Sequence, residues 1–182
     1  MKILTTKIPE VLIIQPKIFN DERGYFFENW NEKIFKKNTG LDIKFVQENH
    51  SFSKKGVLRG LHYQIPKPQG KLVYVAKGKI LDVVVDLRKS SPTFCKNISI
   101  ELSHSNQQQL WIPPGFAHGI LVLSETAELF YKVTDHYAPD CEQCIKWDDK
   151  NLNIDWQLNG TTPLLSEKDK NGKNLKDAFL FS

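Results

Sequence analysis

The chain has 182 residues, of which 40% are apolar and 25% are charged, as is usual for a soluble globular protein. Its 25 basic and 21 acidic residues leave a net charge of only +4, and the basic residues form no long cluster, which argues against nucleic-acid binding. We therefore expect one domain over residues 1–182, with a small anionic molecule and not a nucleic acid as its partner.

The apolar runs and the cysteines argue against two further classes of protein. No apolar run approaches the roughly 18 residues that a membrane span needs. The N-terminal residues include no sustained apolar segment, so we expect a cytoplasmic protein without a membrane anchor. The odd number of cysteines, Cys95, Cys141 and Cys144, argues against a disulfide framework. Cys141 and Cys144 form a single CxxC without a second pair, and we interpret them as structurally incidental thiols.

The first predicted element is a short helix, capped by Asn31 and running through Lys37 with Ile34 and Phe35 turned inward. Short β-like runs follow, separated by glycine and proline turns. In the run 72–87, Lys77-Gly78-Lys79 separates two β-branched segments and predicts a hairpin turn. Further along this run, valines alternate with aspartates, which predicts one buried and one partly polar face. The remaining strand candidates are 58–64, 97–102, 119–123 and 127–133.

The chain beyond Ser166 alternates charged residues with glycine, so we expect it to wrap the surface, with one helical turn around Leu175–Phe179. Many short strands and few helices predict an all-β fold, a two-sheet antiparallel sandwich that is most simply a jelly roll.

The segment 58–64 brings together residue types that could form a reactive site. With a period of two, Arg59 and Leu61 would share one side of the strand, and His62 and Gln64 the other. Gly60 would allow a ligand or another backbone to approach closely. A histidine titrates near neutral pH and can act as a base, although a satisfied structural histidine remains the alternative.

Two arginines border glycines in otherwise apolar, β-like sequence. Arg23 precedes Gly24, and Arg59 precedes Gly60. A guanidinium group can grip phosphate oxygens with two parallel hydrogen bonds. From the sequence alone, phosphate binding and surface ion pairing are equally good explanations of these two arginines.

The segment Trp111–Gly119 reads as a strand, a tight proline turn and a second strand that contains His118. Its PxG…H pattern resembles the second conserved motif of cupins, in which that histidine binds a metal. The other metal ligands of cupins come from an upstream H-x-H, and this chain has none. We therefore expect a cupin-type jelly-roll β-sandwich with a few short helices and without a metal.

Seven motifs follow one another along nearly the whole chain, from Ile14 to about Asp169: FNDERGYFFENW, FVQENHS, VLRGLHYQ, QGKLVYV, WIPPGFAHG, ELFYKVTDHYAP and LSEKD. In this order they resemble the dTDP-4-dehydrorhamnose 3,5-epimerase family. The resemblance implies a cupin-like jelly roll, an obligate homodimer, and catalysis without metal or redox cofactor. The substrate it implies is a dTDP-linked 4-keto-6-deoxy sugar of dTDP-L-rhamnose-type biosynthesis.

The resemblance also implies roles for four catalytic residues. His62 resembles the base that removes a proton beside the ketone, and Asp169 the carboxylate that orients it. Lys71 resembles the lysine that faces the keto oxygen, where a cation stabilises the enolate. Tyr131 matches the tyrosine that returns a proton from the opposite face, which inversion requires. Taken alone, Tyr131 would be a packing residue and Asp169 a solvated one.

The remaining matches concern substrate binding. By resemblance, two arginines contact the diphosphate, three polar residues hold the nucleotide, one tyrosine stacks on thymine, and His118 lies near the sugar. In dimers of the family, the strand that carries the first arginine crosses to the neighbouring subunit, so that each site is shared. The matching residues are Arg23, Arg59, Glu28, Gln47, Asn49, Tyr137 and His118, with Glu142 and Lys168 as further substrate contacts.

Several alternatives remain open on the sequence. An epimerase acting at C3 or C5 alone would use the same base and acid. A 3,4-ketoisomerase also moves protons around a keto sugar on a cupin scaffold. A non-catalytic nucleotide-sugar binding module would keep Arg23 and Arg59 but lose His62, Tyr131 or Asp169. A metal cupin dioxygenase fits least well, since its ligands are missing.

Overall fold

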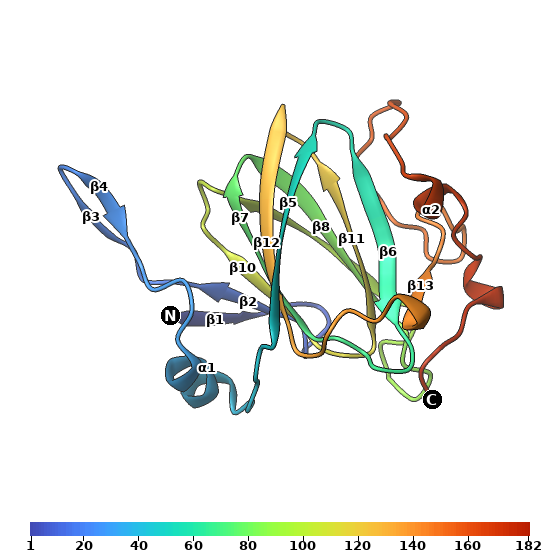
Figure 1. The fold of residues 1–182 in the computed structure, drawn as a ribbon, viewed down its shortest axis with the longest axis horizontal. Coiled ribbons are helices and arrows are strands. Elements are labelled where there is room, and N and C mark those ends of the chain that lie inside the picture. Colours follow the sequence, from blue (N-terminus) through green and yellow to red (C-terminus); the bar gives the residue numbers. More distant parts are fainter.

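The computed structural model describes all 182 residues. Its main body is a sandwich of two antiparallel sheets that face each other (Figure 1). One sheet has six strands in the order β1-β2-β10-β7-β12-β5, and the other has five in the order β13-β6-β11-β8-β9. This sandwich confirms the predicted fold class. The strands are β1 Lys2–Thr5, β2 Leu12–Gln15, β5 Gln47–Lys54, β6 Leu58–Gln64, β7 Lys71–Lys77, β8 Lys79–Asp86, β9 Asn97–Ser103, β10 Gln109–Ile112, β11 Phe116–Val122, β12 Thr126–Val133 and β13 Glu142–Cys144.

Part of the space between the two sheets is filled by one cluster of buried apolar side chains. Val73 and Leu129 of the six-stranded sheet belong to the same cluster as Val84 and Ile120 of the five-stranded sheet. Burying each such side chain contributes about 1.5–3 kcal/mol relative to leaving it exposed. The remaining interior between the sheets is therefore free to hold charged groups.

Strand β8 shows the predicted alternation, and its partly polar face, which carries Asp82 and Asp86, is buried as well as the apolar one. Leu81, Val83 and Val85 point away from the sandwich interior and pack against the segment that follows β13, including Trp156 and Leu175. This segment runs over the outside of the five-stranded sheet (Figure 1). It contains the short helix α2, Glu167–Lys170, and the 3-10 turn η2, Leu175–Asp177, which confirms the expected wrapping tail and its helical turn. A second 3-10 turn, η1, covers Pro139–Cys141.

Gly78 is a corner between the two sheets and not the predicted hairpin turn. Strand β7 ends at Lys77 in the six-stranded sheet, and β8 begins at Lys79 in the five-stranded sheet, with no pairing between them. Gly78 has a φ of 80°, which L side chains rarely adopt. A Cβ added to Gly78 would lie 2.0 Å from the Thr126 carbonyl oxygen and 2.5 Å from the Ser124 hydroxyl oxygen. Only glycine fits this corner.

We expect Gly78→Ala to lower the free energy of unfolding by roughly 2–4 kcal/mol, the sum of a left-handed backbone and an overpacked contact. Gly56→Ala is the matched control, because Gly56 has a nearly identical φ of 77° with no atom within 4 Å of an added Cβ. The control should lose only about 1 kcal/mol. Denaturant unfolding of both variants measures the difference, and equal losses would contradict a packed corner.

The N-terminal region adds a helix and a projecting hairpin to the sandwich. Helix α1, Glu32–Thr39, begins after Asn31, whose side chain accepts a hydrogen bond from the Ile34 amide at 3.1 Å. Phe35 is buried against Trp111, which confirms the predicted helix and its inward face. Strands β3, Phe19–Asp21, and β4, Gly24–Phe26, form a two-stranded hairpin that extends away from the sandwich (Figure 1). Neither α1 nor α2 has the length and apolar character that a membrane crossing requires.

Candidate active site

A bulge in β6 directs the polar residues of this strand to one side. His62 pairs with His118 of β11, and Arg59 pairs with Ile120, so Gly60 and Leu61 of β6 lie opposite the single residue Gly119 of β11. Arg59 and His62 therefore both line the space between the sheets, while Leu61 packs on the outer face. The prediction that Arg59 and Leu61 share one side of the strand was wrong, because the bulge interrupts the period of two. A Cβ added to Gly60 would lie 2.5 Å from the Gly119 Cα atom, which confirms the predicted close approach of another backbone.

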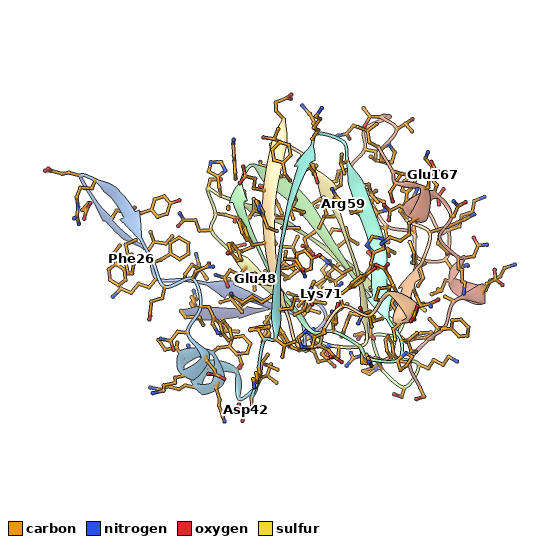
Figure 2. All side chains as sticks on the ribbon, viewed as in Figure 1. Phe26, Asp42, Glu48, Arg59, Lys71 and Glu167 are labelled. Atoms are coloured by element: carbon orange, nitrogen blue, oxygen red, sulfur yellow. The ribbon has the colours of Figure 1, made fainter.

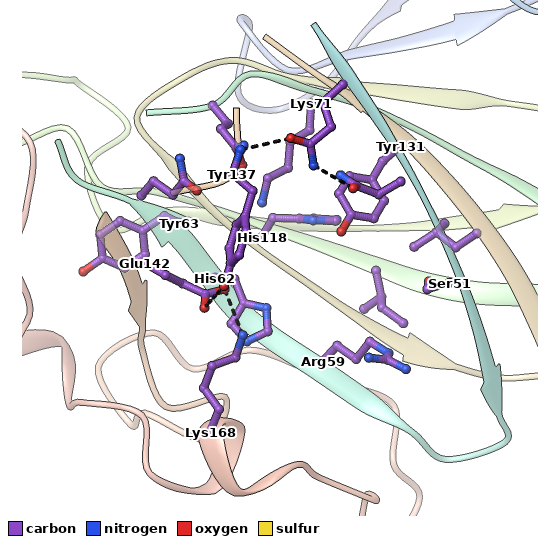
Figure 3. Close-up of a pocket in the computed structure, with 16 residues that line it drawn as sticks. Ser51, Arg59, His62, Tyr63, Lys71, His118, Tyr131, Tyr137, Glu142 and Lys168 are labelled. Atoms are coloured by element: carbon purple, nitrogen blue, oxygen red, sulfur yellow. Dashed lines mark hydrogen bonds and ion pairs between the residues drawn. The ribbon is translucent and has the colours of Figure 1, made fainter. Parts of the chain in front are cut away.

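The polar end of the sandwich contains a cavity of about 340 Å³ between the two sheets (Figure 3). Strands β5, β7 and β12 form one wall, and β6, β11 and β13 form the other. Lys71 and Arg59 both line this cavity, and their labels lie in the body of the sandwich, away from the hairpin that carries Phe26 (Figure 2). Ten of the thirteen predicted site residues line the cavity: Gln47, Asn49, Arg59, His62, Lys71, His118, Tyr131, Tyr137, Glu142 and Lys168.

His62 and Asp169 form a hydrogen-bonded pair at one wall of the cavity. The His62 Nε2 and Asp169 Oδ1 atoms are 2.6 Å apart. Burial lowers the pKa of His62 below its ordinary value of 6.5, and the hydrogen bond to Asp169 opposes that shift. The imidazole is therefore mainly neutral at pH 7, with one ring nitrogen tied to the carboxylate and the other available to accept a proton.

Asp169 is fixed in place by its neighbours at the start of α2. The Ser166 hydroxyl donates to Asp169 Oδ2 at 2.6 Å, and the Gly60 amide donates to Asp169 Oδ1 at 3.2 Å. Burial alone would raise the pKa of Asp169, but the hydrogen bonds with His62 and Ser166 bring it to about 2. Asp169 is thus a permanent negative charge behind the imidazole.

Lys71 and Tyr131 reach the cavity from the six-stranded sheet, on the wall opposite the strand that carries His62. Burial lowers the pKa of Lys71 to about 8, although Asp82 and Glu142 both oppose this shift. Burial also raises the pKa of Tyr131 above its ordinary value of 10, so the phenol keeps its proton at pH 7. The cavity therefore holds a neutral imidazole on one wall and a protonated phenol and an ammonium on the other.

Hydrogen bonds connect the residues at the mouth of the cavity (Figure 3). Glu142 accepts from the Lys168 ammonium at 2.8 Å and from the Tyr137 hydroxyl at 2.9 Å. Burial alone would raise the pKa of Glu142, but these two partners lower it below its ordinary value. The Gln47 side chain donates to Asn49 at 2.8 Å and accepts from the Tyr137 amide at 3.1 Å. Half of the Tyr137 surface remains exposed, which leaves its ring accessible for stacking.

Arg23 and Glu28 lie outside this cavity. Arg23 lies at the tip of the projecting hairpin, with a side chain that is 90% exposed and paired with Asp21. Glu28 follows the hairpin and accepts a hydrogen bond from the Asn31 side chain at 2.9 Å. Within one chain, the structure does not bring these two residues to the other predicted site residues.

Comparison with known proteins places this arrangement in a family. Residues 5–177 match the model of the dTDP-4-dehydrorhamnose 3,5-epimerase family. This chain belongs to the dTDP-4-dehydrorhamnose 3,5-epimerase family. The 3,5-epimerases of this name from Shigella flexneri and Pseudomonas aeruginosa are 53% and 52% identical to it, and each match covers 100% of this chain and 99% of the relative.

A solved structure of an epimerase of this family also superposes closely. It is the dTDP-6-deoxy-D-glucose-3,5-epimerase of Legionella pneumophila in complex with dTDP-4-keto-L-rhamnose. The two chains are 48% identical with a TM-score of 0.95, and the match covers 98% of this chain and 94% of that one. The fold and the family resemblance predicted from the motifs are thereby confirmed.

In this member of the epimerase family, the sequence analysis missed residues that act on the shape of the cavity. The buried Gln64 side chain accepts from the Ala138 amide at 2.9 Å and so holds the loop that carries Tyr137. Ser51 and Gln69 also line the cavity. Asp82 was not predicted as a site residue, because the alternation in its strand indicated only a partly polar face. A charged residue within an otherwise continuous apolar run was the available signal for Asp82.

This epimerase-family chain contains one group of neighbouring side chains of types that can bind metals. The donor atoms of His62, Cys144 and Asp169 lie within 4.8 Å of one another. Burial raises the pKa of the Cys144 thiol to about 12, so this side chain is a protonated thiol at pH 7. His62 and Asp169 already satisfy each other at hydrogen-bonding distance. The cluster therefore has the chemistry of a histidine–aspartate pair with a neutral thiol beside it.

Proposed function

We propose that this chain is a dTDP-4-dehydro-6-deoxy-D-glucose 3,5-epimerase, which inverts C3 and C5 of the sugar in dTDP-L-rhamnose-type biosynthesis. One observation carries the proposal: an imidazole and a phenol line opposite walls of one cavity, with a buried ammonium between the sheets. Relatives that are about 50% identical in sequence over the whole chain carry names that indicate the same substrate class.

The first chemical step in this proposal is removal of a proton from a carbon beside the ketone. His62 accepts that proton, and Asp169 stabilises the resulting imidazolium. The electron pair of the broken C–H bond moves onto the keto oxygen, which becomes an enolate oxygen. Lys71 faces that oxygen, and an ammonium in a water-poor cavity stabilises the developing negative charge far more than it would in water.

The second step returns a proton to the same carbon from the other side of the ring. A single base on one face would restore the original configuration, so inversion needs a second proton donor. The Tyr131 phenol supplies that proton in this proposal, because its raised pKa keeps it protonated and its wall faces His62. The electrons of the enolate form the new C–H bond, and the keto group is restored.

The nucleotide part of the substrate would occupy the mouth of the cavity. We assign contact with the diphosphate to Arg59, whose guanidinium is held by the Ser53 hydroxyl at 3.1 Å. Tyr137 would stack on thymine, and His118 would lie near the sugar. Gln47 and Asn49 would hold the nucleotide, while Glu142 and Lys168 make further substrate contacts.

We also propose a homodimer in which the hairpin of one subunit completes the site of the other. The hairpin exposes three large apolar side chains, with exposed fractions of 51% for Phe19, 59% for Tyr25 and 68% for Phe26. Exposed aromatic residues on a projecting hairpin are typical of a subunit contact. Arg23 and Glu28 would then reach the diphosphate and the nucleotide bound by the partner subunit.

Deuterium incorporation tests the proposed reaction directly. The protein is incubated with dTDP-4-keto-6-deoxyglucose in deuterated water, and mass spectrometry counts the deuterons gained by the sugar. Two deuterons support epimerisation at C3 and C5, and one supports a mono-epimerase. A product whose keto group has moved indicates a 3,4-ketoisomerase. No deuterium would leave a nucleotide-sugar binding module as the better reading.

Tyr131→Phe should separate proton removal from inversion. We expect this variant to keep part of the deuterium exchange, because His62 still removes the proton and returns a deuteron on the same face. The inverted product should fall by roughly 10²-fold or more, the usual contribution of a positioned acid. Tyr74→Phe, on the outer face of the same sheet, is the matched control. Normal inversion by Tyr131→Phe would exclude this phenol as the donor.

Mixing two inactive variants tests the shared site. Arg23→Ala and His62→Ala chains are refolded or exchanged together, so that some dimers contain one of each. If the hairpin serves the partner, one site of each mixed dimer carries both changes and the other carries neither. About one site in four should then be intact at equal mixing, with substantial recovery of activity. No recovery would show that each subunit supplies all of its own site.

A further inference from the structure

Asp82 is a buried carboxylate that the reaction described above does not use. It lies on β8 with an exposed fraction of 0%. Its two oxygens lie 3.0 and 2.9 Å from a single nitrogen, His118 Nε2. A buried carboxylate without enough compensating partners destabilises a fold, so such a residue is seldom present for packing alone.

Asp86, four residues further along the same face of β8, shows how a purely structural carboxylate is satisfied. It is equally buried, but it accepts hydrogen bonds from the Arg88 guanidinium and from the hydroxyls of Ser91 and Thr93. Asp86 thus has a full set of donors, including one fixed positive charge. Asp82 has one imidazole, and the missing positive charge must come from elsewhere in the cavity.

Lys71 is the cation that meets this need. It is buried without any salt-bridge partner within 4.0 Å, and Asp82 is the strongest influence that keeps it protonated against burial. The charged and titratable groups around Lys71 come from six elements besides β7. They are Asp82 on β8, His118 on β11, His62 on β6, Tyr131 on β12, Glu142 on β13 and Lys168 on α2.

We propose that Asp82 is a positioning residue for the epimerase reaction: its carboxylate orients the His118 ring and supplies the negative charge that keeps Lys71 an ammonium. This role rests on the proposed function. The hydrogen bond to Asp82 fixes the proton on His118 Nε2, so the Nδ1 lone pair is the one available to a sugar hydroxyl. The same carboxylate offsets the burial that would otherwise neutralise Lys71.

The test measures the rate of deuterium incorporation as a function of pH. It compares the alkaline limb, the fall of this rate at high pH, between the wild type and its variants. In the wild type the limb should lie near pH 8, where Lys71 loses its proton. Removing the negative charge in Asp82→Asn lowers the pKa of a nearby cation, so activity should be lost at a lower pH, by about one unit. A shift of that size means an additional loss of about fivefold at pH 8 and very little at pH 6.

Two further variants separate the two parts of the role. His118→Asn removes the imidazole and keeps the carboxylate, so kcat/KM should fall at every pH while the limb stays near that of the wild type. The double variant Asp82→Asn/His118→Asn places two amides face to face and differs from His118→Asn only in the carboxylate. Its limb should move down by the same unit, which keeps the test available even if Asp82→Asn alone folds poorly. Asp86→Asn should lose stability and leave the limb unchanged.

Each outcome has a distinct meaning. A wild type that incorporates no deuterium overturns the proposed function, and the role of Asp82 with it. A wild type that incorporates deuterium, together with identical limbs in His118→Asn and the double variant, overturns only the role of Asp82. A limb that moves equally in Asp86→Asn also overturns it, because the shift would then follow from lost stability.

Discussion

His62→Ala is expected to slow deuterium incorporation by roughly 10²–10⁴-fold, the range that a positioned general base contributes. The imidazole is well suited to this step, because burial keeps its pKa below 6.5 and leaves it unprotonated at neutral pH. Asp169 is fixed by the Ser166 hydroxyl and the Gly60 amide, so it holds the ring without reorganisation. Incorporation measured at saturating substrate reports the loss in kcat.

His104→Ala is the control for this experiment, because His104 is exposed and lies outside the cavity. It should retain the wild-type rate. Near-normal incorporation by His62→Ala would mean that another residue is the base. His118 would then be the next residue to replace, since it lines the same cavity and pairs with its own carboxylate.

Lys71→Met is expected to reduce kcat by roughly 10²–10³-fold, as removal of one group that stabilises an oxyanion does in other enzymes. Methionine keeps much of the length and apolar contact of the lysine but removes its charge. The loss should appear both in deuterium incorporation and in product formation, because the enolate precedes both. Lys77→Met, at the exposed end of the same strand, should have no effect on either.

Stability provides an independent measurement of the same substitution. Lys71 is only 9% exposed, and burying an ammonium costs free energy that methionine does not incur. Asp82 keeps its contacts with His118 in the variant. The buried Asp82 carboxylate loses the nearby cation, however, and this opposes the gain. We therefore expect denaturant unfolding to give Lys71→Met a free energy of unfolding close to that of the wild type. A large loss of stability would mean that the lysine serves the fold and not the reaction.

Local sequence patterns predicted the elements of this fold well wherever the determinants are local. The Asn31 cap and the apolar positions that follow it define α1 within a few residues. The strand candidates all became strands, because β-branched and aromatic runs between turns suit a half-buried pleated surface. The helical turn expected around Leu175–Phe179 is present as η2.

Features that depend on distant contacts were not predictable in this way. A glycine between two β-like runs looks the same in a hairpin and in a corner between sheets, and only the pairing partners of β7 and β8 distinguish them. The bulge in β6 likewise follows from its pairing with β11, so a strict period of two misplaced Arg59. The second buried face of β8 exists because the chain returns over it about 70 residues later.

The candidate site came from the resemblance and not from any single residue. Tyr131 has the sequence surroundings of a packing residue, and Asp169 those of a solvated one. The structure brings Asp169 to His62 across 107 positions of sequence, a distance that no local pattern encodes. Arg23 and Glu28 remain apart from the cavity of their own chain, and their assignment depends on the proposed dimer.

The position of Asp169 late in the chain has a consequence for biosynthesis. The ribosome makes both sheets before it makes α2, and the nascent strands already carry His62, Lys71 and Tyr131. The sandwich can therefore collapse around its apolar cluster while the histidine still lacks its carboxylate. Docking of the last-made segment then covers the outer face of β8 and supplies the carboxylate, so it completes the fold and the catalytic pair in one event.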